Sequence, residues 1–249
     1  MKTLDLLLDK AYVPGRGFCH AFSDGKARVF GLLDDQVQMA QALLDAFEAT
    51  GERRYLTKAE EVMDLTLRLF WDGVNGGFFD TAQNSEGVLT LEVRNKPIQD
   101  TPTPSPNGVA ALVLDRLSAL TGKGLYRLMA EETLKAFAET AGGLGLFGAT
   151  YFLALDLHLS HPAQVVIVGR KGDERTEALH RTALSSFRPG KVVALYDPEE
   201  VKGAPLPKVL ASMIEAAPGP LAYVCAGEAC AAPTSDPEQL QETLQSLGF

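Results

Sequence analysis

Asp34 and Asp35 are adjacent carboxylates placed where an amphipathic segment of the sequence begins. A pair of carboxyl groups can act as general acid and general base on a glycosidic bond or a free sugar. The simpler interpretation is that one carboxylate caps a helix and both interact favourably with the helix dipole. Capping accounts for one of the two residues and leaves the second without a structural requirement. Both are therefore candidate catalytic residues.

A second group of candidate residues surrounds a turn and a proline-rich crossing segment. Asp100 and Asn107 flank the prolines and could hydrogen-bond sugar hydroxyls, with Asp100 as the opposing catalytic carboxylate, or they could simply stabilise turns. Trp71, Phe78 and Phe79 border an Asn-Gly-Gly turn that is typical of a β-hairpin. Their rings could stack on a sugar, although aromatic side chains more often belong to the core. We take Asn107 and the three aromatic residues as candidate substrate-binding residues.

The three cysteines give no sign of a metal site or a disulfide framework. Their number is odd and their spacing irregular, which argues against a disulfide-stapled secreted domain. Cys225 and Cys230 are close in sequence, but no nearby histidine completes a zinc site. We expect both to be reduced and buried, and we expect no metal and no cofactor. Cys19 and His20 would point to opposite faces of a strand, so they do not predict a thiolate–imidazole pair.

Composition limits the classes of partner. The chain has 249 residues and a formal net charge of -9, so its surface repels phosphate backbones and nucleic acid is not an expected partner. Asp5 and Asp9 interrupt the apolar residues at the N-terminus, which is not the pattern of a signal peptide. No apolar stretch is long enough to span a bilayer, so we expect no membrane association and a cytoplasmic location.

The first part of the sequence is predicted to be helical. Apolar residues recur at helical spacing, and helices are expected at about 34–50, 54–70, 105–121, 125–141 and 146–159. An internal repeat supports helical hairpins, because one set of residues recurs at a constant offset. The first copy is Thr50, Gly51, Tyr55 and Ala-Glu-Glu at 59–61, and the second is Thr121, Gly122, Tyr126 and Ala-Glu-Glu at 130–132. Repeated helical hairpins are typical of solenoids and toroids.

The second part of the sequence alternates between strand and helix patterns. Strands are expected at 164–169, 191–196 and 221–224, and helices at 174–187, 207–216 and 236–247. This alternation favours a small sheet with mainly parallel strands. The boundary is placed near His161 and Pro162, giving a helical domain at 1–161 and a small α/β module at 162–249.

Three ordered motifs resemble a thioredoxin-domain-containing family that includes spermatogenesis-associated protein twenty and bacterial relatives. They are Gly-Leu-Leu-Asp-Asp-Gln at 31–36, Asp100 followed by Pro-Ser-Pro-Asn at 104–107, and Pro-Leu-Ala-Tyr-Val-Cys at 220–225 with Cys230 and Asp-Pro at 236–237. The resemblance implies a six-hairpin α/α-toroid akin to glycosidases and sugar epimerases. The family's thioredoxin-like domain and its Cys-x-x-Cys motif are absent from this sequence, so redox activity is not implied.

The expected fold is therefore mainly α, a partial α/α-toroid of the six-hairpin glycosidase type followed by a small α/β module. The expected function is that of a carbohydrate-active or carbohydrate-binding protein, with acid/base chemistry by carboxylates in the toroid cavity and a small sugar as ligand. The alternative is a non-catalytic subunit or scaffold that completes a toroid with another chain. About half a ring is present, and its open flanks predict a homodimer or a separately encoded partner chain carrying the missing hairpins.

Overall fold

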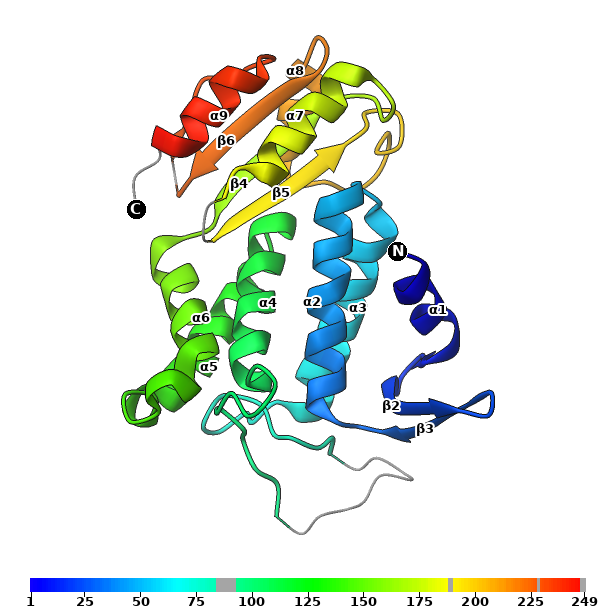
Figure 1. Cartoon of the computed structure of the whole chain (residues 1–249), viewed down its shortest axis with the longest axis vertical. Coiled ribbons are helices and arrows are strands. Elements are labelled where there is room, and N and C mark those ends of the chain that lie inside the picture. Colours follow the sequence, from blue (N-terminus) through cyan, green and yellow to red (C-terminus); the bar gives the residue numbers. More distant parts are fainter. Residues whose placement is uncertain (84–92, 188–189, 228, 247–249) are drawn as a thin grey trace.

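The chain folds into a block of helices with an α/β module lying across one end (Figure 1). The computed structural model describes residues 1–83, 93–187, 190–227 and 229–246. The mainly helical first part and the α/β second part agree with the coarse fold class expected from the sequence. Within the described residues, none of the helices is long and apolar enough to cross a lipid bilayer.

The N-terminal segment forms a short helix and a small antiparallel sheet beside the helical block. Helix α1 spans Lys2–Lys10, and strands β1 (Tyr12–Val13), β2 (Gly17–Ser23) and β3 (Lys26–Phe30) follow in sheet order β1-β2-β3. The sheet was not expected from the sequence. Its position matters for the site, because β2 lies against the first turn of helix α2 (Leu33–Thr50).

Two helical hairpins form the centre of the block, as the internal repeat predicted. The first pairs α2 with α3 (Arg53–Phe70), and the second pairs α4 (Pro106–Thr121) with α5 (Gly124–Ala141). Both hairpins turn in the same way, with a glycine in the left-handed conformation directly after the first helix, at Gly51 and Gly122. In each, the hydroxyl of the preceding threonine donates to the helix and accepts from the next turn residue. The two copies therefore share hydrogen bonds as well as sequence.

The repeat extends to the start of the first helix of each hairpin, α2 and α4. Gln36 and Asn107 stand at equivalent positions in the two copies, and both are fully buried. Each uses its carboxamide to pair with both backbone groups of a buried phenylalanine, Phe18 in the first copy and Phe78 in the second. These contacts attach β2 to α2 and the turn after α3 to α4. A last helix, α6 (Ala149–Ser160), follows a short 3-10 turn and packs against α4 and α5.

The α/β module has a four-stranded mixed sheet in the order β5-β4-β6-β7. Its elements are β4 (Ala163–Val168), α7 (Glu174–Ser185), β5 (Lys191–Tyr196), α8 (Lys208–Ala216), β6 (Leu221–Ala226), β7 (Ala229–Cys230) and α9 (Pro237–Ser246). Strands β4 and β5 are parallel, but β6 runs antiparallel to both β4 and β7, so the sheet is mixed and not mainly parallel as expected. The antiparallel hairpin β6–β7 brings two cysteines opposite one another.

The two faces of this sheet pack against different parts of the molecule. One face contributes Val165, Ile167, Val193 and Leu195 to a core with α7 and α9. Alternate residues of the opposite face join the main core of the helical block. These are Val192, Ala194 and Tyr196. The core is thus continuous from the helical hairpins into the sheet, and the first hairpin is attached through Glu48, whose carboxylate accepts from the Val193 backbone amide at 3.0 Å.

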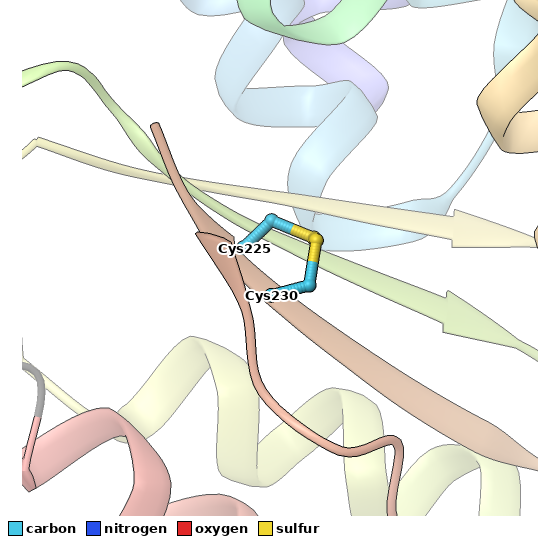
Figure 2. Close-up of a disulfide and its surroundings, with 2 residues drawn as sticks. All are labelled: Cys225 and Cys230. Carbon is cyan, nitrogen blue, oxygen red and sulfur yellow. A yellow bond between two sulfur atoms is a disulfide. The ribbon is translucent and has the colours of Figure 1, made fainter. Parts of the chain in front are cut away.

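Two local expectations were wrong. Helix α2 begins at Leu33 with Leu32 as N-cap, so Asp34 lies inside the first turn and does not cap the helix. Cys225 and Cys230 form a disulfide and are not buried thiols (Figure 2). The error has a physical cause: β6 is longer than expected, and its hairpin register with β7 places the two cysteines directly opposite each other.

Candidate functional site

The first turn of α2 divides the two candidate carboxylates between two neighbours. Consecutive residues of a helix point about 100° apart. Asp35 turns toward strand β2, and Asp34 turns toward the crossing segment, here defined as residues 93–105. Both carboxylates lie in the first turn of the helix, where its dipole favours negative charge.

Asp35 pairs with His20, a residue that the sequence did not single out as its partner. The Asp35 Oδ1 lies 3.0 Å from His20 Nδ1, with side-chain exposures of 17% and 59% respectively. The other carboxylate oxygen, Oδ2, is buried and has no hydrogen-bond partner among the described residues. Burial raises the pKa of the Asp35 carboxyl, and the contact with His20 offsets only part of this effect. The Asp35 carboxyl is therefore more readily protonated than an ordinary aspartate.

Asp34 lines an open hollow of mixed polar and apolar lining that we call the crossing-segment cavity. Its volume is about 470 Å³. The lining residues are Asp34, Lys96, Pro97, Ile98, Gln99, Thr101, Thr103 and Pro106. Gln38 donates to Asp34 Oδ1 at 3.4 Å and to the Pro104 carbonyl oxygen at 3.5 Å, which joins the helix start to the crossing segment. The cavity offers a carboxylate, a carboxamide, hydroxyls and apolar proline rings.

Lys96 is held on the wall of this cavity by a second set of contacts. Its ammonium lies 2.5 Å from Asp72 Oδ2 and donates to the Gly76 carbonyl oxygen at 2.6 Å. The Lys96 hydrogen bond holds the pKa of Asp72 well below its usual range. Phe79, a candidate stacking residue, does not line the cavity, and its ring centroid is 5.2 Å from Lys96 Nζ and 4.1 Å from the Arg94 guanidinium. A ring flanked by two cations is partly covered by the protein itself.

Asp100 lies near the cavity but uses both carboxylate oxygens within the protein. Oδ1 accepts from the Ser105 amide at 2.7 Å, and Oδ2 accepts from the Thr150 amide at 2.8 Å. Burial alone would raise the pKa of Asp100, but these amides outweigh it and lower the pKa. The carboxylate therefore stays ionised and clamps the crossing segment to the start of α6. These contacts are of the kind expected if Asp100 stabilises a turn, and they also reach Thr150 at the start of α6.

Asn107, Phe78 and Trp71 do not line the cavity. Asn107 accepts from the Phe78 amide at 2.7 Å and donates to the carbonyl oxygens of Phe78 at 3.0 Å and Pro97 at 2.8 Å. Phe78 is fully buried and packs edge-on against the half-buried Trp71, with ring centroids 5.1 Å apart. Asn107 holds Pro97 in the cavity wall, and Phe78 and Asn107 are themselves enclosed in the core.

Of the seven candidate residues, Asp34 alone lines the cavity. Asp35 lies one residue away and contacts His20, and Phe79 contacts Lys96, a residue of the cavity wall. Among the described residues, no group of three histidine, cysteine, aspartate or glutamate side chains is arranged to hold a metal ion. His20 could be found only by knowing that β2 crosses the start of α2, which no local pattern indicates.

Comparison with known proteins shows a relationship by descent. The chain is homologous to spermatogenesis-associated protein 20 of Homo sapiens, with 32% identity over 217 residues, and to its Rattus norvegicus counterpart, with 31% identity. An uncharacterized Caenorhabditis elegans protein is 26% identical over 220 residues. The human alignment covers 86% of this chain but only 27% of the relative, so the chain spans about a quarter of the relative's length. No protein-family model matches the chain.

Proposed function

We propose that this chain binds a sugar, or a similar polyhydroxylated molecule, in the crossing-segment cavity. The observation that carries the proposal is the position of Asp34 at the helix start, facing a hollow whose other walls are polar side chains and proline rings. Sugar hydroxyls both donate and accept hydrogen bonds, whereas the carbon faces of the ring are apolar. A carboxylate, a carboxamide, two threonine hydroxyls and rigid apolar surfaces are complementary to such a ligand.

The acid/base step of this proposal belongs to Asp35 and His20. Two adjacent carboxyl groups in different environments can take different roles, one remaining ionised while the other holds a proton. Asp34 would accept a hydroxyl hydrogen bond inside the cavity. Asp35 and His20 do not line the cavity, so they would exchange a proton only with a part of the ligand that extends over the start of α2 toward β2. The His20 Nδ1 is engaged by Asp35, so transfer to a ligand would use Nε2. Asp100 is assigned to the cavity wall, because its oxygens are occupied by backbone amides.

We further infer that the two hairpins are part of an α/α-toroid of the glycosidase or epimerase type. In support, the starts of α2 and α4 lie at the same end of the helical block, where the crossing segment also lies (Figure 1). Their equivalent residues Gln36 and Asn107 make equivalent contacts. A toroid would place both helix starts around one opening, with Asp34 on its rim.

Ligand-observed NMR with a panel of monosaccharides and sugar phosphates tests the binding proposal. We expect saturation transfer to at least one sugar, and we expect Asp34→Asn to weaken that signal by about tenfold in affinity, the effect of losing one charge-assisted hydrogen bond. The matched control is Asp24→Asn, an exposed turn residue in the left-handed conformation, which asparagine tolerates. Equal binding by the two variants would remove Asp34 from the site.

A second candidate, a non-catalytic subunit or scaffold, is favoured by the exposed face of α6. This helix lies at the margin of the helical block (Figure 1), and Phe152, Leu153 and Leu159 are 44%, 60% and 67% exposed. Apolar clusters of this kind mark interaction surfaces. We propose that this flank packs against further helices, supplied by a second copy of the chain or by a separately encoded partner chain.

Sedimentation distinguishes this candidate from the sugar-binding proposal. We expect concentration-dependent association of the native chain at micromolar concentration, and we expect Leu153→Lys to abolish it. Leu184→Lys on α7, at a residue that is 41% exposed, is the matched control. A native chain that stays monomeric and binds no hydrophobic dye would contradict the scaffold proposal without affecting the sugar site.

A further inference from the structure

A second cavity lies between the helical block and the α/β sheet. Its volume is about 260 Å³, and most of its lining is apolar. The walls are the end of α4 at Leu120, the sheet residues Val166 and Ala194, and helix α8 at Leu210 and Met213. Most of these side chains are buried or half-buried. A hollow of this size and composition fits a small apolar group such as an aromatic ring or a short alkyl chain.

The disulfide lies in the wall of this cavity. Cys225 is one of the lining residues and pairs across the sheet with Gln164, which also lines the hollow. Figure 2 shows the Cys225–Cys230 bond on the sheet face turned toward the helical block, while α7 and α9 lie beyond the opposite face. The only sulfur–sulfur bond among the described residues therefore borders an apolar pocket.

The two cysteine residues differ in their surroundings. Cys225 is half-buried on β6, next to the cavity, whereas Cys230 is exposed on the two-residue edge strand β7. A thiolate is strongly stabilised by water and is disfavoured in apolar surroundings. When the bond is cleaved, the electron pair is better accommodated on Cys230 than on Cys225. The exposed sulfur is thus the better leaving group.

We propose that this cavity captures a small thiol with an apolar body through exchange with the Cys225–Cys230 disulfide. The thiolate of the ligand attacks Cys225 Sγ and forms a new sulfur–sulfur bond, while the Cys225–Cys230 bond breaks. The electron pair passes to Cys230 Sγ, which takes a proton from water, as the ligand thiol lost one to water. The ligand is oxidised to a mixed disulfide, and Cys230 is reduced.

The reverse reaction releases the ligand. The Cys230 thiolate attacks the mixed disulfide at Cys225 and restores the original bond, so exchange needs no other oxidant or reductant. Attachment at Cys225 leaves the apolar body of the ligand in the cavity, where its burial favours the adduct. Attachment at Cys230 would leave it in water. The site therefore favours apolar thiols, because the sulfur that they bind, Cys225 Sγ, lies beside the cavity that buries them.

Single-cysteine variants test this selectivity directly. In a Cys19→Ser background, Cys230→Ser leaves only Cys225, and Cys225→Ser leaves only Cys230. Each variant is treated with dibenzyl disulfide or with bis(2-hydroxyethyl) disulfide, and the mixed disulfide is followed by intact mass. For each cysteine we compare the equilibrium constant for the benzyl adduct with that for the hydroxyethyl adduct. Because the ring is buried only at Cys225, we expect this ratio to be at least about tenfold larger at Cys225 than at Cys230.

Blocking the cavity provides the second control. Met213→Trp on α8 fills the hollow and should abolish the benzyl preference of Cys225, whereas Leu184→Trp on α7, on the other side of the sheet, should leave it unchanged. The wild-type protein gives a measurement that requires no cysteine variant: benzyl mercaptan should open its disulfide at a lower thiolate concentration than 2-mercaptoethanol. Equal preferences at Cys225 and Cys230, or equal potency of the two thiols, would overturn the proposal.

Discussion

Replacing Asn107 by alanine should destabilise the chain strongly, although the residue is not expected to touch a ligand. The side chain is fully buried and makes three hydrogen bonds to backbone groups of Phe78 and Pro97. Each bond contributes about 1 kcal/mol, and each buried group left unpaired costs about 1–3 kcal/mol. We therefore expect Asn107→Ala to lower the free energy of unfolding by about 4 kcal/mol.

Urea unfolding measured by two probes tests this expectation. Trp71 is the only tryptophan of the chain and packs on Phe78, so its fluorescence reports on the region that Asn107 holds. Far-UV circular dichroism reports on the helices. Asn95→Ala is the matched control: Asn95 is exposed, its backbone pairs with Asp80, and its substitution should cost less than about 0.5 kcal/mol. If the two variants lose similar stability, Asn107 does not lock the cavity wall.

Three further variants follow from the same contacts and are measured in the same way. Gln36→Ala should lower the free energy of unfolding by about 3 kcal/mol, because the Gln36 carboxamide pairs with the Phe18 backbone as Asn107 pairs with Phe78. A loss below about 1 kcal/mol would contradict the equivalence of the two copies. Glu48→Ala should lower the free energy of unfolding by about 3 kcal/mol, since it leaves the half-buried Arg116 paired only with the more exposed Asp45; an unchanged midpoint would refute this. Asp35→Asn should stabilise the chain near neutral pH. Burial raises the pKa of Asp35 in the folded state, so the protonated carboxyl favours folding in acid, and this contribution is lost as the pH rises through the folded pKa. The gain should shrink below the ordinary carboxyl pKa, and a pH-independent gain would count against this cause.

The helices were predictable because their signals are local. Apolar residues at helical spacing indicated α2 to α6, and Gly51 and Gly122 marked the turns of both hairpins correctly. Strand β5 was predicted with its observed bounds, since it is a short apolar run between turn residues. The N-terminal sheet was missed because β1 has only two residues and because buried and exposed residues do not alternate regularly along β2 and β3.

The site was less predictable because its contacts are tertiary. That Asp34 and Asp35 lie at a helix start and point about 100° apart could be read from the sequence, but which neighbour each carboxylate meets depends on what packs beside that helix. The link between Asp35 and His20 requires β2 to cross the first turn of α2. The disulfide was missed for a similar reason, because it depends on the hairpin register of β6 and β7 and not on cysteine spacing alone.

The most direct test of the proposed function is a crystal structure of the chain soaked with the sugar that gives the strongest NMR signal. The account predicts density for the sugar in the crossing-segment cavity, with a hydroxyl within hydrogen-bond distance of the Asp34 carboxylate and with contacts to the residues that line the same walls. Density for the sugar at another place, with the cavity filled only by water, would contradict it.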